Sequence, residues 1–144
     1  TIIKRIADNF GSQSVVVSVD IKKNLLGKYK LYRSLDRKKI EQPWLPYLQQ
    51  MESAGAGEMI VNSVDLDGTM EGMDLHLIRE AASAVNVPLI AMGGVGKLED
   101  IKAAVEAGAS GVSAGAFFVF QGPHRAVLIT YPGYGELEFL LGKK

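Results

Sequence analysis

The strongest constraint on the fold is an alternation of short apolar runs with segments of helical periodicity. The apolar runs lie near residues 15–21, 58–64, 87–92 and 111–116, and they are rich in small and β-branched side chains. Runs of about five to seven residues with this composition are typical of strands that are buried on both faces. Around them, apolar residues recur at helical spacing in the segments 2–10, 44–54, 74–85, 98–107 and 134–141.

This alternation predicts an α/β fold with a parallel sheet, because consecutive βα units connect through right-handed crossovers. We interpret residues 1–144 as a single domain of four such units. Four units can form an open, flavodoxin-like sheet or one half of a closed (β/α)₈ barrel, which usually has about 250 residues. The longest irregular stretch is 22–39, and its alternating segment 28–32 predicts a small strand pair.

The composition restricts the classes of partner. The 16 basic and 16 acidic side chains cancel, so no net field attracts nucleic acid or an anionic membrane surface. No apolar run is long enough to span a bilayer. The absence of cysteine excludes disulfides and thiolate metal sites, and it fits a reducing cytoplasm.

Asp20 is the first candidate for chemistry, because it stands at the end of the first apolar run. The carboxyl ends of buried parallel strands are where α/β enzymes collect their catalytic groups. A carboxylate that is partly desolvated there can serve as a general acid or base. The alternative is an aspartate that only ends the strand and caps the next turn, and position alone supports the two interpretations equally.

Asn62, Ser63 and Asp67 belong to a dense polar cluster that follows the second apolar run. A solvated βα turn needs fewer polar groups than this, so the cluster favours a substrate-binding loop. Carboxylates here could suit a metal, but the only nearby histidine, His76, falls in the next helix, and we predict no metal site. Glu58 begins the same strand, and its position alone indicates only a strand start.

The third and fourth apolar runs both end in small residues. Gly93 and Gly94 follow the third run, and Ala114 and Gly115 follow the fourth. Glycine lets the backbone approach an anion closely, and a following helix directs free N–H groups at it. Two such ends in succession match the phosphate site after strands seven and eight of a (β/α)₈ barrel, with tight helix–strand packing as the alternative.

Two basic residues follow the fourth run. The side chain of either His124 or Arg125 could assist a phosphate, although a solvated side chain is the more ordinary interpretation of both.

These motifs, in this order, resemble the cyclase subunit of imidazole glycerol phosphate synthase. The matching stretches are 15–20, 55–69, 93–97, 108–109 and 113–115. They cover nearly the whole chain but only the second half of the family's (β/α)₈ barrel. In that family a glutaminase partner releases ammonia, which passes along the barrel axis to a ribulosyl aminoimidazole phosphate substrate. The barrel then splits the substrate and closes an imidazole ring.

The resemblance implies a role for each candidate residue. It implies that Asp20 is a catalytic aspartate and that Glu58 gates the entry of ammonia at the bottom of the barrel. The implied substrate contacts are Asn62, Ser63 and Asp67, and the implied phosphate site consists of Gly93, Gly94, Ala114 and Gly115. The implied partners are a glutaminase subunit and a phosphorylated small-molecule substrate. We expect no cofactor and no metal.

Some positions depart from the pattern of the histidine-pathway enzymes. Asn62 stands where the family often has Thr, Gly115 stands where it often has Ser, and the loop 22–39 lacks the usual glycine-rich, lysine-containing pattern. The run 120–129 instead resembles a paralogous group associated with amidation of bacterial surface-polysaccharide sugars. A barrel subunit that supplies ammonia for that amidation, and a non-catalytic half-barrel, are therefore alternative functions.

A half-barrel also leaves strand edges and an apolar inner face uncovered. Unpaired edges and open apolar faces are association sites, so we expect a chain with these boundaries to self-associate. The residues that we expect on the inner face are Val17, Ile60, Ile90 and Val112.

Overall fold

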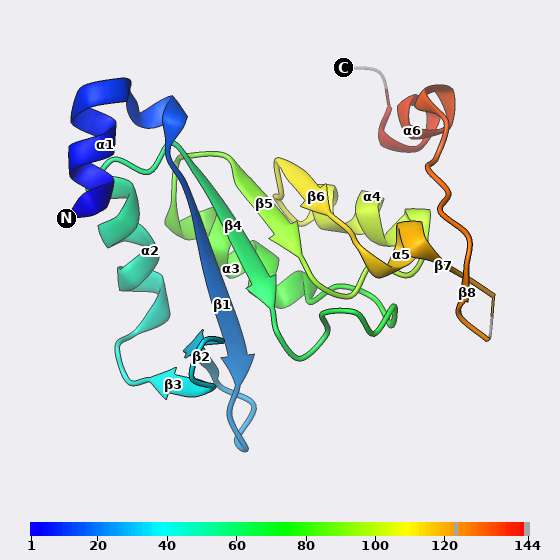
Figure 1. Cartoon of the computed structure of the whole chain (residues 1–144), viewed down its shortest axis with the longest axis horizontal. Helices are drawn as coiled ribbons and strands as arrows, with labels where there is room; N and C mark the ends of the chain where they lie inside the picture. Colours follow the sequence, from blue (N-terminus) through cyan, green and yellow to red (C-terminus); the bar gives the residue numbers. More distant parts are fainter. Residues whose placement is uncertain (123, 143–144) are drawn as a thin grey trace.

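The computed structural model describes residues 1–122 and 124–142, and its centre is a six-stranded sheet in the order β3-β2-β1-β4-β5-β6 (Figure 1). Four of these strands run parallel and form the predicted succession of βα units. They are β1 (Val16–Lys23), β4 (Glu58–Ser63), β5 (Leu89–Met92) and β6 (Gly111–Ser113).

The remaining elements surround this sheet or follow it. The helices are α1 (Ile2–Phe10), α2 (Trp44–Ser53), α3 (Leu75–Ala84), α4 (Leu98–Glu106), α5 (Ala116–Val119) and α6 (Tyr134–Leu141), with a 3₁₀ turn at Ser12–Ser14. The other strands are β2 (Tyr29–Arg33), β3 (Lys38–Ile40), β7 (Phe120–Gln121) and β8 (Ala126–Val127). None of the helices in the described residues is both long and apolar enough to cross a membrane.

The strand pair predicted in the long loop is present as β2 and β3, which add antiparallel to the edge of the parallel sheet. Pairing with β2 also lengthens β1 beyond the predicted end, because Lys22 and Lys23 pair with Lys30 and Tyr29. The last two parallel strands are shorter than their apolar runs. β5 begins at Leu89, and β6 ends at Ser113 because the chain turns into α5 soon afterwards.

The helices α2, α3 and α4 cover one face of the parallel sheet. Buried side chains on this face include Val19, Ile21, Met59, Val61 and Leu89 from the strands, and Leu48, Met51, Leu77 and Ala81 from α2 and α3. A smaller cluster joins Ala91 to Ile78 and Ala104. An open doubly wound sheet carries helices on both faces, whereas a barrel strand carries them on the outer face alone. The one-sided cover is therefore the arrangement of barrel units.

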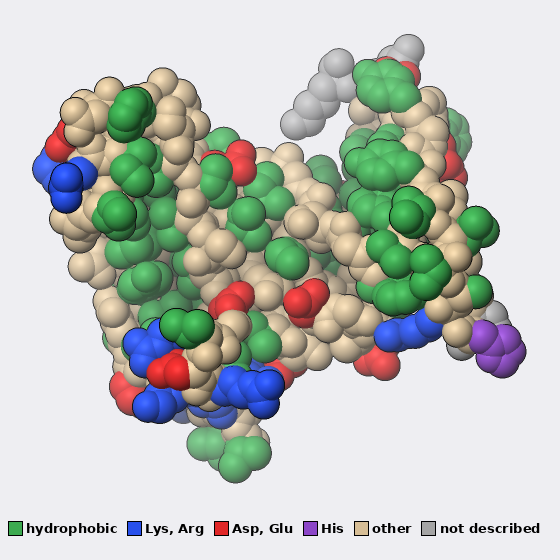
Figure 2. Space-filling model, in the orientation of Figure 1, with side chains coloured by type: hydrophobic (Ala, Val, Ile, Leu, Met, Phe, Trp, Pro, Cys, Tyr) green, Lys and Arg blue, Asp and Glu red, His purple; other side chains and the backbone are tan. Residues whose placement is uncertain are grey.

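The opposite face of the parallel sheet is open, and Figure 2 shows apolar side chains scattered across it. Ser18, Ile60 and Ile90 lie side by side on this face in the strand register. The sequence prediction was right for Ile60 and Ile90 but wrong for Val17 and Val112, which pack against the helix-covered clusters. The reason is the pleat, because neighbouring residues of a strand point to opposite faces.

Candidate functional site

The carboxyl edge of the open face holds Asp20 and Asn62, which are partners in the register of β1 and β4. The Asn62 Nδ2 donates a hydrogen bond of 3.0 Å to Asp20 Oδ1. The other carboxylate oxygen accepts a hydrogen bond from the Ser34 hydroxyl, which comes from the turn between β2 and β3. Both bonds come from side chains, whereas a capping aspartate would accept from backbone amides. Asp20 is thus a carboxylate oriented toward the open face.

Asn62 is 9% exposed, and its orientation is fixed by this bond. If the amide were flipped, its oxygen would face the Asp20 carboxylate, which donates nothing when ionised. The Oδ1 atom has no hydrogen-bond partner among the described residues. It lies beside Gly93, where a Cβ atom would stand 3.1 Å from it and 2.6 Å from the Ser63 carbonyl oxygen. Position 93 therefore accepts only glycine, which also suits its φ of 98°.

A cavity of about 50 Å³ lies at the same edge, among the ends of β5 and β6 and the loop that follows β4. Its lining residues are Asp67, Gly68, Met92, Gly93, Gly94, Val95, Ser113, Ala114, Gly115 and Ala116. The structure thus brings together Asp67 and the four small residues that the sequence singles out for phosphate. Ser63 does not join them, because the pleat directs its side chain to the helix-covered face, where it is 7% exposed.

The glycines of this cavity serve different purposes. A Cβ atom at Gly94 would come within 2.0 Å of the Gly72 carbonyl oxygen, and the Gly72 N–H donates to the Gly94 carbonyl at 2.8 Å. Gly94 therefore lets the loop after β4 pack directly on the loop after β5. At Gly115 an added Cβ would meet nothing within 4 Å, so this position borders open space.

Glu58 lies at the opposite end of the open face. Val16 pairs with Glu58, and Asp20 pairs with Asn62, so about 13 Å of strand separates the two levels at 3.3 Å per residue. The half-buried Glu58 is thus remote from Asp20 and from the cavity.

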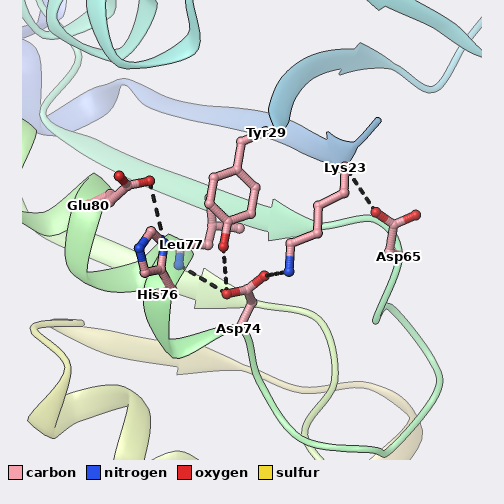
Figure 3. A network of polar contacts seen from close by, with 7 residues as sticks. All are labelled: Lys23, Tyr29, Asp65, Asp74, His76, Leu77 and Glu80. Carbon is pink, nitrogen blue, oxygen red and sulfur yellow. Dashed lines mark hydrogen bonds and ion pairs between the residues drawn. The ribbon is translucent and has the colours of Figure 1, made fainter. Parts of the chain in front are cut away.

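The loop after β4 is tied to the turn end of the β1–β2 hairpin by a polar network (Figure 3). Asp65 Oδ2 accepts from the Lys23 backbone N–H at 2.8 Å, and its Oδ1 lies 2.8 Å from Lys22 Nζ. Asp74 pairs with Lys23 Nζ at 2.7 Å and accepts from the Tyr29 hydroxyl at 2.8 Å. It also caps α3 by accepting from the Leu77 N–H at 3.1 Å. The same loop carries Asp67, so the network restrains one wall of the cavity.

The pKa values in this network follow from burial and pairing. Burial of Asp74 opposes its ionisation, but the bonds from Lys23, Leu77 and Tyr29 prevail and lower its pKa below the usual value. For Asp65, burial is likewise outweighed by Lys22 and Lys23, and its pKa is lowered. Burial and the bond to Asp74 raise the pKa of Tyr29 well above its usual value. At neutral pH the two aspartates are therefore ionised and the Tyr29 phenol is neutral.

The sequence argument missed Ser34 and underestimated Arg125. Ser34 reaches Asp20 only because β2 folds back along β1, and no local pattern marks it. Arg125 is exposed, as expected, but its guanidinium donates to the carbonyl oxygens of Gly68 and Thr69 at 3.2 and 2.8 Å. His124 is exposed. In residues 1–122 and 124–142 no cluster of His, Asp and Glu is arranged to hold a metal ion.

Comparison with known proteins gives this geometry a family context. The imidazole glycerol phosphate synthase subunit HisF of Thermobifida fusca is 42% identical over 124 residues, which are 83% of this chain and 48% of that protein. A Pseudomonas aeruginosa protein, provisionally named subunit hisF2 of this synthase, is 43% identical over 139 residues, or 96% of this chain and 55% of that protein. The chain spans about half the length of these relatives.

The family itself is established by a match to its sequence model. The sequence model of the family described as "Histidine biosynthesis protein" matches residues 1–123. The four βα units, with helices on one face, are the second half of a (β/α)₈ barrel of this family. The chain therefore belongs to the histidine biosynthesis protein family and is similar to its HisF-type members.

Proposed function

We propose that this chain forms the half of a HisF-type cyclase subunit that carries one catalytic aspartate and one phosphate site. The proposed reaction uses ammonia from a glutaminase partner to cleave and cyclise a ribulosyl aminoimidazole phosphate. One observation carries the proposal: Asp20 and the glycine-lined cavity lie at the same carboxyl edge of the open sheet face. This is the edge at which (β/α)₈ barrels assemble their active sites.

The cavity is proposed to hold a terminal phosphate of the substrate. Glycine at positions 93, 94 and 115 places no side chain between the cavity and the backbone, and backbone amides can stabilise an anion without a metal. At about 50 Å³ the cavity suits a terminal group rather than a whole metabolite. The rest of the substrate would then extend over the open face toward Asp20, past Asn62.

Asp20 is proposed to transfer protons during cleavage and ring closure. Attack by ammonia on a carbonyl carbon leaves a nitrogen that must lose protons, and the departing group must gain one. A carboxylate that is held in one orientation by Asn62 and Ser34 can accept the first proton and return it. Glu58, at the other end of the face, is proposed to admit the ammonia.

The test is the Asp20→Asn substitution in a complete HisF-type barrel that contains these residues. With ammonium salt and the ribulosyl substrate, we expect turnover to fall by about 10²–10⁴, the usual loss for a general acid or base. Asp8→Asn, at an exposed position of α1, is the matched control and should leave turnover unchanged. Normal turnover by Asp20→Asn would refute the assignment.

A second candidate is a paralogous subunit that supplies ammonia for amidation of a surface-polysaccharide sugar. It is favoured by the run 120–129, which resembles that paralogous group. The same assay separates the candidates. Ring closure supports the cyclase, whereas binding of the ribulosyl substrate without turnover supports the paralogue.

A further inference from the structure

The turn between β7 and β8 reaches back to the loop that follows β4. Arg125 lies in this turn with a φ of 49°, and its N–H donates to the Gly122 carbonyl at 3.1 Å. Its guanidinium bonds Gly68 and Thr69, which lie 57 and 56 residues away in the sequence. A left-handed φ is uncommon for a residue with a side chain, so this turn presents the arginine in a defined direction.

The loop that Arg125 contacts has an unusual backbone. Gly68 and Met70 have φ values of 75° and 63°. Within the loop, the Asp67 N–H donates to the Ser63 carbonyl and the Thr69 N–H donates to the Leu66 carbonyl, both at 3.0 Å. The carbonyl oxygens of Gly68 and Thr69 both accept hydrogen bonds from the Arg125 guanidinium.

Asp67 and Gly68 also line the glycine-rich cavity, whereas Arg125 does not. Arg125 therefore contacts a segment that lines the cavity without lining the cavity itself. Both bonds come from one nitrogen, Nη2, whose two N–H groups are fixed in the plane of the guanidinium, whereas a lysine ammonium is a mobile point charge.

We propose that Arg125 is a positioning residue for the anion site: it fixes the backbone of residues 67–69 and so sets the shape of the cavity wall. The effect on phosphate rests on the proposed function, whereas the effect on the loop does not. Arg125 thereby links the segment that leads into β8 to the loop that follows β4.

The experiment compares Arg125→Ala and Arg125→Lys with Arg37→Ala in the 144-residue chain. Arg37 is a matched control, because it is an exposed arginine in a turn with a φ of 56°. Its neighbour Asp36 forms ion pairs with Arg33 and Lys38. Two quantities are measured for each variant: amide hydrogen exchange at residues 67–69, and the affinity for inorganic phosphate by calorimetric titration.

We expect both Arg125 variants to exchange faster at residues 67–69 and to bind phosphate about three- to tenfold more weakly, the effect of losing a net hydrogen bond or two. Arg37→Ala should match the wild type in both measurements. If Arg125→Ala does not fold, Arg125→Lys carries the test, because it keeps the charge and the aliphatic stem.

Three results would overturn the positioning role of Arg125 or its link to the anion site. Phosphate affinity of Arg125→Lys equal to that of the wild type would show that charge alone matters and would overturn the positioning role. Unchanged exchange at residues 67–69 would overturn it as well, and faster exchange with unchanged phosphate affinity would remove its link to the anion site. If the wild type itself binds no phosphate, the proposed anion site fails, while the exchange data still decide whether Arg125 braces the loop.

Discussion

Replacing Asp74 by alanine should destabilise the chain far more than replacing Asp65, although both aspartates pair with a lysine. The Asp74 side chain is 8% exposed and accepts bonds from Lys23, Tyr29 and Leu77. The Asp65 side chain is 37% exposed. Loss of the α3 cap costs about 1 kcal/mol. A part-buried Tyr29 hydroxyl without its acceptor costs about 1–2 kcal/mol more, and the half-exposed Lys23 pair adds at most about 1 kcal/mol.

The expected free energy of unfolding is therefore about 3 kcal/mol lower for Asp74→Ala. For Asp65→Ala we expect a loss of about 1 kcal/mol or less. Asp74→Asn should lie between them, because an amide oxygen can still accept from Tyr29 or from the Leu77 N–H. Urea denaturation at one fixed protein concentration measures all three. Equal losses for Asp74→Ala and Asp65→Ala would refute the argument that burial and the three bonds make Asp74 the anchor of this network.

Three further predictions concern the cavity, pH and assembly. Gly115→Val should weaken phosphate binding because the position lines the cavity, and it should not unfold the chain because an added Cβ meets only open space. Gly94→Val should instead disrupt the loop through its clash with Gly72. Phosphate titration measures the binding of both variants, and circular dichroism measures their folding. Because the pKa of Asp74 is lowered in the folded chain, the ionised side chain stabilises the fold fully above its unfolded pKa of about 4. This stabilisation is lost as the pH falls through the pKa of the folded state. The urea midpoint should therefore fall less with acid in Asp74→Asn than in the wild type. The isolated chain should scatter light as a dimer or larger, because residues 127–139 and the open sheet face expose apolar side chains (Figure 2); a monomer at micromolar concentration would contradict this.

The sequence predicted the order of the four parallel strands and the helices between them, but it did not predict α5, β7 or β8. Apolar runs that end in Asp20, in Asn62 and in small residues mark the carboxyl edge of the parallel sheet, and parallel strands bring those ends together whatever the details of packing. It was harder to predict which residues of each strand point to the helix-covered face and which to the open face. In a run such as residues 15–17, where every residue is valine, no polar alternation distinguishes the two faces, and Val17 was assigned to the wrong one.

Contacts between distant segments could not be predicted either. Ser34 meets Asp20, and Arg125 meets Gly68, only after a hairpin folds back on the sheet. Nothing within a few residues of either side chain signals the contact. The same holds for Lys23 and Asp74, whose pairing depends on where α3 begins relative to β1.

We propose above all that the carboxyl edge of the sheet, which carries Asp20, also holds a phosphate at the ends of β5 and β6. Titration of the isotope-labelled chain with inorganic phosphate, followed by amide chemical shifts, tests it most directly. We expect saturable shifts at residues 93–94 and 114–116, smaller shifts at residues 67–68, and none around Glu58 at the far end of the open face. Shifts confined to other parts of the chain, or no saturable shifts at these residues, would contradict it.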